Sequence, residues 1–343
     1  GPYLEPPHRL ARMYNVIPHA RVYITRLEKA ARRLGVEILL AAEETSLIVE
    51  DGVVVGVRVV VGGTPRELRA RGGVILATGD FTGNPAMRER FLSPEAAAAS
   101  PINPHASGDG QRLGMELGAA TKAMSAIRGP QLRFPEPAHP GLLSRLPTWR
   151  WLCSMEAAIV RRVPTSWLKP VVKSLLITWM SPTPEMFKKG AILVNHEGNR
   201  FCDEPKGTGS LSFQPGGKGF LIFDAGIAEY FDTPPHSIST APGIAFATLS
   251  DYRRGRPDLV RQAADAAALA RAIGVDPGNL EKAVADCGYT PPLWAMGPAY
   301  SKLTVSEGGL CLDDRMRVLR EDGSFIPGLY GAGGVAQSGM TLE

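Results

Sequence analysis

Three short glycine-rich segments, far apart in the sequence, contain the residues of this chain best suited to chemistry. They are Ala77-Thr78-Gly79, Gly108-Asp109-Gly110 and Gly331-Ala332-Gly333-Gly334. Glycine lets a backbone approach a ligand closely, and the free amide groups at the start of a helix bind anionic groups. Because glycines end strands in any α/β protein, it is the joint occurrence of the turns that predicts one shared cradle for an extended nucleotide cofactor.

Each turn is expected to be positioned by a helix or a strand. Residues 73–78 form a continuous apolar run, which is typical of a parallel strand that is covered on both faces. Residues 108–118 are expected to form a helix that begins at the second turn. Residues 329–331 are expected to form another strand, which ends at the third turn.

The first segment of the chain predicts a helix, a strand and a hairpin. Residues 23–34 carry apolar side chains at helical spacing and end before a glycine, so we expect a helix that packs on a sheet. Residues 36–40 are expected to form a strand. Residues 46–50 and 53–61 flank Asp51-Gly52, a pair that favours a tight hairpin turn.

The middle of the chain has a different composition. Residues 129–184 are rich in Pro, Trp and Arg, and residues 151–180 predict two short apolar helices broken at Pro164 and Pro170. One interpretation is a cap subdomain whose apolar faces are internal. The other is an interfacial surface that admits a hydrophobic substrate or lies on a bilayer.

The second half predicts further elements of both kinds. Residues 190–195 and 199–201 suggest a hairpin, and residues 258–274 suggest an alanine-rich amphipathic helix closed by a glycine. A further helix is expected to begin at Asp276, with proline in its first turn.

Bulk composition excludes several classes of protein. The 343 residues predict two domains, and 44% apolar with 21% charged residues is ordinary for a globular protein. Lys and Arg exceed Asp and Glu by only 38 to 34, so we expect no nucleic-acid partner. The four cysteines lie far apart, which argues against a metal site or a disulfide framework and favours a cytoplasmic setting. No segment has the composition of a membrane span or a signal peptide.

Taken in order, these motifs resemble the superfamily of FAD-dependent fumarate reductases and 3-ketosteroid dehydrogenases. The resemblance covers nearly the whole chain, and its closing residues are similar to a ketosteroid-dehydrogenase-like branch. It is carried by residues 71–79, 107–110, 190–204, 307–310, 327–335 and 338–343.

The resemblance implies that FAD is held by the three glycine turns, with Asp109 in contact with it. The family's opening strand with Gly-x-Gly-x-x-Gly is not found in this sequence, and neither is the helix that follows its last motif, so we expect a chain truncated at both ends. Asp80 stands where the family usually has a second glycine, and Gly334 where it usually has Glu or Asn.

Three residues are candidates for the catalytic step. Relative to the glutamate Glu204, fumarate reductases have an arginine four positions later and ketosteroid dehydrogenases a tyrosine, whereas this chain has Thr208. Tyr300, at the expected border between domains, offers a phenol whose pKa near 10 can be tuned towards neutrality, unless it only packs there. Ser306 could hydrogen-bond a substrate carbonyl or only cap its glycine turn. Val305 occupies the place of the family's carboxylate-binding histidine.

These expectations combine into one hypothesis. The fold is α/β: a partial two-dinucleotide, Rossmann-like FAD-binding domain (residues 1–121 and 300–343) with an inserted α+β cap domain (residues 122–299). The implied activity is α,β-dehydrogenation, or reduction, of a hydrophobic, 3-ketosteroid-like carbonyl compound, with an external electron acceptor or donor. The alternatives are a fumarate-type dicarboxylate reductase, a nonenzymatic module that binds apolar ligands or a membrane surface, and an inactive fragment.

Overall fold

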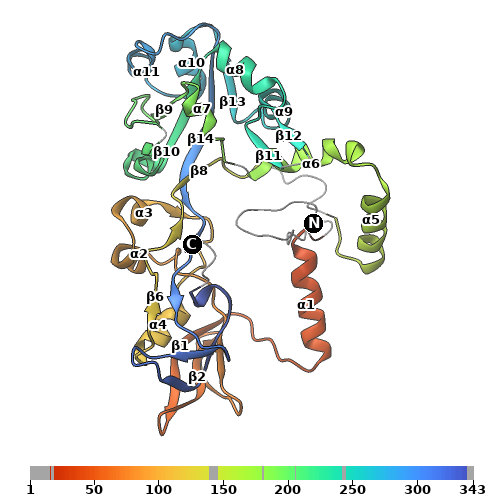
Figure 1. The fold of residues 1–343 in the computed structure, drawn as a ribbon, viewed down its shortest axis with the longest axis vertical. Helices are drawn as coiled ribbons and strands as arrows, with labels where there is room; N and C mark the ends of the chain where they lie inside the picture. The colour runs from red at the N-terminus through yellow and green to blue at the C-terminus, as the bar shows by residue number, and fades with distance from the viewer. Residues whose placement is uncertain are drawn as a thin grey trace. The chain divides into compact units, whose positions relative to one another are not determined.

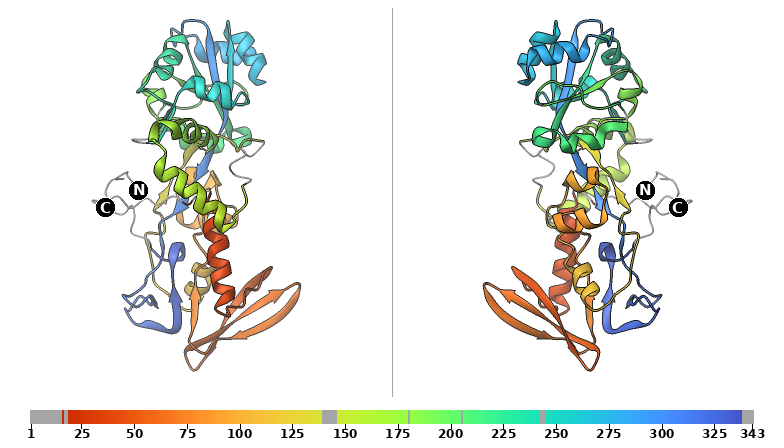
Figure 2. Two further views of the ribbon diagram at one scale, coloured as in Figure 1. Left: turned by 90° about the vertical axis from the view of Figure 1, so that its right-hand side faces the viewer. Right: turned by 90° about the vertical axis from the view of Figure 1, so that its left-hand side faces the viewer.

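The computed structural model describes residue 16 and residues 19–138, 146–179, 181–204, 206–241 and 245–337. Over these residues the chain forms two compact units. Unit 1 comprises the described residues of 1–38, 133–205 and 219–299, and unit 2 those of 39–132, 206–218 and 300–343. Both units mix helices and strands (Figure 1 and Figure 2), which confirms the α/β class. The domain limits expected from the sequence stay a prediction.

Unit 2 is built on two small sheets with one shared core. One sheet has the order β1-β2-β3 and the other β17-β18-β4, and β18 and β4 are parallel neighbours. The turn between β1 and β2 has the positive φ angles at Asp51 (48°) and Gly52 (78°) that a tight hairpin needs. This confirms the predicted hairpin. The strands are β1 (Ala42–Glu50), β2 (Val53–Val61), β3 (Thr64–Arg69), β4 (Val74–Leu76), β5 (Ser100–Pro101), β6 (Thr121–Lys122), β7 (Ile127–Arg128), β8 (Gln131–Arg133), β15 (Val305–Ser306), β16 (Gly309–Leu310), β17 (Arg317–Leu319) and β18 (Phe325–Gly331).

The helices of unit 2 are short, and α2 and α3 each begin at a side-chain cap. Asn84 and Ser93 accept hydrogen bonds from the backbone at the starts of α2 and α3, with proline in the first turn of each helix. The core contains buried side chains of β1, β2, β4, β16–β18 and α4, among them Leu113 and Leu310. The helices are α2 (Pro85–Phe91), α3 (Pro94–Ala98), α4 (Asp109–Glu116), and the 3-10 segments η2 (Lys206–Phe213), η3 (Pro215–Gly217) and η4 (Gly333–Val335).

Unit 1 is organised around the sheet β13-β14-β10-β9, and its helices α10 and α11 pack against that sheet. β14 continues past Ala299, so its last residues belong to unit 2. The strands are β9 (Ile192–Asn195), β10 (Lys218–Phe223), β11 (Ser239–Ala241), β12 (Ala245–Ala247), β13 (Val260–Ala263) and β14 (Leu293–Leu303). The helices are α1 (Arg21–Arg33), α5 (Arg150–Arg162), α6 (Thr165–Trp179), α7 (Glu185–Lys188), α8 (Ala225–Asp232), α9 (Leu249–Gly255), α10 (Ala266–Ile273) and α11 (Pro277–Val284).

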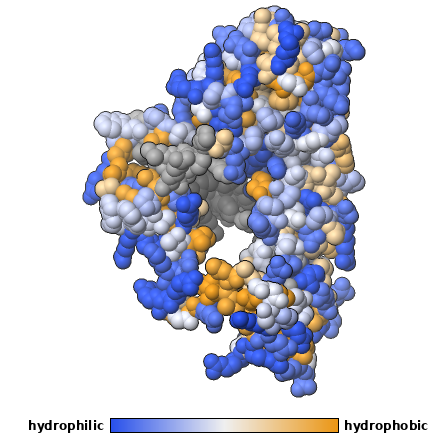
Figure 3. Space-filling view, turned by 180° about the vertical axis from the view of Figure 1, so that it is seen from behind, coloured by the Kyte–Doolittle hydropathy of each residue, from blue (hydrophilic) through white to orange (hydrophobic). Residues whose placement is uncertain are grey.

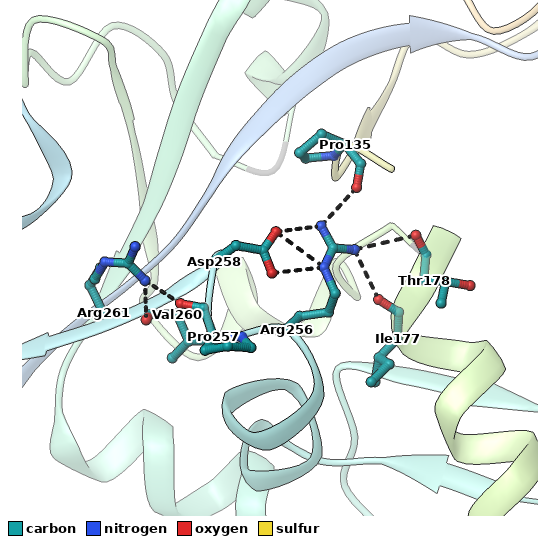
Figure 4. Close-up of polar contacts among 8 residues, drawn as sticks. All are labelled: Pro135, Ile177, Thr178, Arg256, Pro257, Asp258, Val260 and Arg261. Carbon is teal, nitrogen blue, oxygen red and sulfur yellow. Dashed lines mark hydrogen bonds and ion pairs between the residues drawn. The ribbon is translucent and has the colours of Figure 1, made fainter. Parts of the chain in front are cut away.

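A buried arginine joins three segments of unit 1 (Figure 4). The guanidinium of Arg256 donates to the carbonyl oxygens of Ile177 (3.3 Å) and Thr178 (3.4 Å) in the last turn of α6. It also donates to the carbonyl oxygen of Pro135 (2.9 Å) and forms an ion pair with Asp258 (2.8 Å). The last carbonyls of a helix have no partner within it, so Arg256 completes the end of α6. Hydrogen bonding from Arg256, supported by its charge, holds the pKa of Asp258 below the ordinary value.

Two expectations for residues 21–40 are wrong. Residues 36–40 form no strand, because no strand of the described residues pairs with them, and an unpaired strand lacks half its hydrogen bonds. The helix α1 is present, but its predicted packing on a sheet is not observed. Ile24 and Leu27 are 62% and 50% exposed, and Val22 is its buried residue.

The predicted helix over residues 258–274 is wrong in its first half. Residues 260–263 form β13 instead, which pairs antiparallel with β14, and α10 starts only after Asp265. The carboxylate of Asp265 accepts a hydrogen bond from the amide of Ala268 at 2.7 Å, which fixes the helix start. Pairing with a strand that is distant in the sequence thus overrides the alanine-rich pattern.

Three smaller expectations are also corrected. Pro164 separates α5 from α6, but Pro170 lies within α6, which therefore lacks one backbone hydrogen bond without breaking. β9 pairs with β10 and has only a single bridge, Val194 to Arg200, to the predicted return strand. β4 is an edge strand with Ile75 67% exposed, so it is not covered on both faces.

All four cysteines are free thiols. Within the described ranges, no helix combines the length and the apolar character that crossing a membrane requires.

Candidate cofactor-binding site

The first and third glycine turns leave the same edge of the unit 2 sheet. β4 and β18 are parallel, with Leu76 opposite Gly331, and both turns follow at the carboxyl ends of these strands. The amide of Ala332 donates to the carbonyl oxygen of Leu76 at 2.9 Å, so the two turns begin side by side. The carboxyl ends of parallel strands are where open α/β sheets bind ligands.

The second turn joins this edge through the start of α4. Gly108 takes a left-handed conformation (φ 73°) just before the helix, and the amide of Gly110 donates to the hydroxyl of Thr78 at 3.1 Å. A Cβ atom at Gly110 would clash with the side chains of Thr78 and Val335. Glycine is therefore required at this position for the helix to approach β4.

Gln111 connects the turns, although it is not among the site residues that the sequence predicts. Its side chain is fully buried, and its amide nitrogen donates to the carbonyl oxygens of Gly79 (3.0 Å) and Gly334 (3.3 Å). Two carbonyl acceptors require the NH2 group on this side, which fixes the orientation of the amide. The only sequence signal was its position next to Gly108-Asp109-Gly110. All three predicted turns thus meet around one side chain.

The backbone at this edge is open. Gly79 and Gly333 have φ angles of 81° and 71°, and no atom lies within 4 Å of the place where a Cβ would stand. Ala77, Ala332 and Gly333 are exposed to solvent. Small residues and left-handed glycines thus leave room for a ligand to contact the backbone itself.

Asp109 is the first residue of α4. Its carboxylate accepts a hydrogen bond from the hydroxyl of Ser107 and lies 3.8 Å from the guanidinium of Arg112. A carboxylate in the first turn of a helix is favoured by the helix dipole. The side chain is partly exposed, so one side of it remains accessible.

The two departures from the family pattern have a structural reason. The carboxylate of Asp80 accepts hydrogen bonds from the amide and the hydroxyl of Thr82, both at 2.7 Å, and so stabilises its own turn. A Cβ atom on Gly334 would lie 3.3 Å from the amide nitrogen of Asp80 and 3.4 Å from the carbonyl carbon of Gly79. The two turns approach so closely that a larger residue at 334 would have to push them apart.

The candidate catalytic residues lie elsewhere in unit 2. Tyr300 is a partly buried residue of β14, and its hydroxyl has no hydrogen-bond partner among the described residues. The backbone of Thr208 lies in η2, and its side chain is outside the described residues. η2 contacts this part of β14, because the hydroxyl of Ser212 lies 3.4 Å from that of Ser301. No hydrogen bond joins the side chain of Tyr300 to the glycine turns within the described part of the chain.

Ser306 lies in β15, next to the predicted Gly-Gly turn. It is 3% exposed, and its hydroxyl has no partner among the described residues. Cβ atoms on Gly308 and Gly309 would collide with the backbone at Ala123 and Val335. The turn is therefore closely packed, and a substrate reaches Ser306 only if the surrounding residues move.

The predicted hairpin after residue 190 carries an ion pair of unit 1. Glu204 accepts hydrogen bonds from the amide of Leu193 (2.9 Å) and from the guanidinium of Arg200 (2.7 Å). The hydrogen bond between Arg200 and Glu204 raises the pKa of Arg200 above its ordinary value. Burial is the main reason that the pKa of the neighbouring Cys202 thiol is raised to about 12, so this cysteine is a poor nucleophile.

Known proteins resemble this chain over most of its length. An NADH:acrylate oxidoreductase from Vibrio harveyi is 26% identical over 346 residues, which are 93% of this chain and 29% of that protein. A 3-oxosteroid 1-dehydrogenase from Mycobacterium tuberculosis is 27% identical over 369 residues, 94% of this chain and 58% of that protein. The open conformation of a flavocytochrome c3 fumarate reductase matches with a TM-score of 0.60 at 20% identity, covering 92% of this chain and 50% of that one. The chain thus spans from under a third to somewhat over half the length of these relatives.

The residues of the site fit a flavin nucleotide. FAD is long and carries a diphosphate, and the site offers exposed backbone at Ala77, Ala332 and Gly333 beside the start of α4. The family model described as FAD binding domain matches residues 6–143 and 163–342, which is most of the chain. The superfamily expected from the sequence is confirmed. The chain belongs to the FAD binding domain family, and its cofactor is FAD.

Proposed function

We propose that this chain is the cofactor-binding part of an FAD-dependent oxidoreductase that acts on a carbon–carbon bond next to the carbonyl group of a hydrophobic, 3-ketosteroid-like compound. The observation that carries this proposal is the convergence of the three glycine turns on Gln111 at the carboxyl ends of β4 and β18. FAD, when bound, accepts or returns the hydride in such a reaction.

Residues of this chain bind the nucleotide and transfer the proton of the reaction. Thr78, which Gly110 positions, and the open turns at Gly79 and Gly333 hold the nucleotide through hydroxyl and backbone groups. Tyr300 is the candidate for the proton, because its phenol is partly exposed and has no hydrogen-bond partner among the described residues. Thr208 and Ser306 are candidates for orienting the substrate carbonyl through their hydroxyl groups.

The choice of an apolar carbonyl substrate has two supports. The first is the relative from Mycobacterium tuberculosis, which is named as a 3-oxosteroid 1-dehydrogenase. The second is that the positions expected to bind a substrate carboxylate do not carry a free cationic side chain. Val305 and Thr208 stand in place of the expected cationic residues, and Arg200 is already paired with Glu204 at 2.7 Å. An ion-paired arginine is a weak candidate for binding a second carboxylate.

The second candidate is a reductase of small unsaturated carboxylates, of the fumarate type. It is favoured by the relative from Vibrio harveyi, which is named as an NADH:acrylate oxidoreductase. A nonenzymatic apolar-ligand module and an inactive fragment are the remaining alternatives. The electron partner, whether acceptor or donor, is an external one in each of the enzymatic proposals.

A spectroscopic experiment distinguishes these proposals. The purified protein is titrated with FAD, and quenching of flavin fluorescence reports binding. The loaded protein is then mixed without oxygen with a 3-ketosteroid in one sample. In further samples it is reduced with dithionite and mixed with fumarate or acrylate. Bleaching of the flavin band by the ketosteroid supports the first proposal, whereas reoxidation by a carboxylate alone supports the second. If the protein binds no FAD even at high concentration, the proposed function is wrong.

A further inference from the structure

The helix α5 presents an apolar stripe to solvent. Trp151, Met155 and Ile159 follow one another at a spacing of four residues, so they lie on one face of the helix. They are 62%, 48% and 49% exposed. Trp149, just before the helix, stacks on Trp151 with ring centroids 5.9 Å apart. Four adjacent large apolar side chains in water indicate a surface that contacts something else.

A cationic pocket lies beside this stripe. It has a volume of about 350 Å³ and is lined by Arg26, Lys29, Ala30 and Arg33 of α1 and by Arg150, the first residue of α5. Its lining holds four cations and no carboxylate. Arg150 stands between the two stacked tryptophans in the sequence, so one cation of the pocket directly adjoins the start of the apolar stripe along the chain. Figure 3, in which each residue is coloured by its hydropathy, shows hydrophobic residues next to hydrophilic ones in the region of α5, at the left of the view.

We propose that this surface, made of the α5 stripe and the cationic pocket, rests on an anionic phospholipid bilayer. Tryptophan prefers the boundary between the headgroups and the acyl chains, and clustered Lys and Arg side chains attract the phosphates of anionic lipids. The side chains of the stripe enter the acyl boundary, and the pocket binds lipid phosphate groups. A bilayer matches both halves of the surface at once.

The dimensions of α5 agree with this placement. A helix of 13 residues is roughly 20 Å long at about 1.5 Å per residue, too short for a hydrocarbon core of about 30 Å. Such a helix lies in the plane of the interface, with its apolar face towards the acyl chains and its cations towards the headgroups. The proposal does not depend on the proposed enzymatic function, although a hydrophobic substrate would itself partition into the same bilayer.

Vesicle sedimentation tests the proposal. The protein is mixed with sucrose-loaded vesicles of phosphatidylcholine alone or of phosphatidylcholine and phosphatidylglycerol, at low and at high salt. We expect sedimentation with the anionic vesicles and at least a tenfold loss of binding at 0.5 M salt, because salt screens the charges. The double variant Lys29→Gln/Arg33→Gln should weaken binding roughly 25-fold, about fivefold for each cation. The variant Trp151→Ser/Met155→Ser should weaken it at least tenfold.

Two matched controls exclude general effects of charge and hydrophobicity. Arg66→Gln/Arg315→Gln removes the same charge from exposed positions of unit 2, and Val49→Ser/Val53→Ser removes exposed apolar side chains of the β1–β2 hairpin. Both should bind as the unmodified protein does. All variants alter exposed side chains, and their circular dichroism spectra establish that they fold.

The proposal is overturned if the test variants and the controls lose binding equally, or if no anionic vesicle binds. The tryptophan fluorescence gives a further check. A shift to shorter wavelength with anionic vesicles supports the proposal. If inorganic phosphate binds to the pocket while vesicles leave the tryptophan spectrum unchanged, the pocket is an anion site and the bilayer proposal is wrong.

Discussion

The side-chain amide nitrogen of Gln111 lies 3.0 Å from the carbonyl oxygen of Gly79, and the same nitrogen also reaches Gly334. One buried side chain therefore fixes the distance between two turns that are more than 250 residues apart in the sequence. This relationship explains how a site made of glycines, which are flexible by themselves, keeps one shape.

We expect Gln111→Leu to weaken both the fold and the cofactor site. The substitution removes two hydrogen bonds and leaves two carbonyl oxygens without their donor, which costs about 1–3 kcal/mol of unfolding free energy. Because the turns are no longer held together, the Kd for FAD should rise at least tenfold. Urea unfolding and fluorescence titration with FAD measure the two effects. The control Gln262→Leu, at an exposed position of β13, should change neither the unfolding free energy nor the Kd for FAD. If both variants change these two quantities equally, Gln111 does not have this role.

Gly110→Ala should destabilise the protein through steric overlap. The added methyl group meets the side chains of Thr78 and Val335, and overpacking of this kind costs about 1–3 kcal/mol. Gly72→Ala is the matched control, because no atom lies within 4 Å of its added methyl group. Thermal melts should show a lower Tm for the first variant alone. A melt of Gly110→Ala that coincides with the control would mean that α4 can move away from β4.

Tyr300→Phe tests the proton-transfer role in the FAD-loaded protein. The change removes a hydroxyl group and keeps the ring, so turnover of the ketosteroid should fall by about 100-fold or more while KM changes little. Tyr23→Phe, on the exposed face of α1, serves as the control. Steady-state rates with an artificial electron acceptor provide the measurement. Unchanged turnover in Tyr300→Phe would remove this residue from the mechanism.

The ion pair between Arg256 and Asp258 predicts a pH dependence of stability. Arg256 lowers the pKa of Asp258 in the folded state below its ordinary value of 3.8, so the unfolded carboxylate takes up a proton first as the pH falls. The stability that the pair contributes is therefore fully present above pH about 4 and is lost at lower pH. Asp258→Asn should be less stable than the unmodified protein at pH 7, and this difference should shrink towards pH 2.

Chemical denaturation at pH 7, 5, 4 and 3 measures this difference. Asp314→Asn removes an exposed carboxylate that has no ion pair among the described residues, so its effect should stay small at every pH. If the difference in unfolding free energy between Asp258→Asn and the unmodified protein stays constant across the series, the charge of Asp258 does not contribute to stability and the prediction is wrong.

The sequence was most informative where structure depends on neighbours along the chain. The hairpin at Asp51-Gly52 needs two residues that tolerate positive φ, and the helix after Asp276 needs a side chain that caps its first turn. Both signals are local, and both predictions are confirmed. The glycine turns were found for the same reason, since each turn requires glycine by itself.

The sequence was least informative where a residue depends on a distant partner. β13 forms because Val260 lies opposite Met296, and nothing near residue 260 encodes that pairing. Gln111 could not be identified because its role exists only after Gly79 and Gly334 have come together. The prediction that α1 packs on a sheet was wrong for the same reason. An apolar face at helical spacing shows what a helix can bury, but not whether a sheet lies against it.

The hydroxyl of Thr78 has a directional consequence. Its oxygen already accepts the amide hydrogen of Gly110, so its own hydrogen stays available to point outward from the sheet edge. A ligand that binds there meets a hydrogen-bond donor with exposed backbone on either side of it. Electron-rich oxygens, such as those of a sugar alcohol chain or a phosphoryl group, are therefore preferred over ammonium groups, and a valine in place of Thr78 would preserve the shape of the edge while erasing that preference.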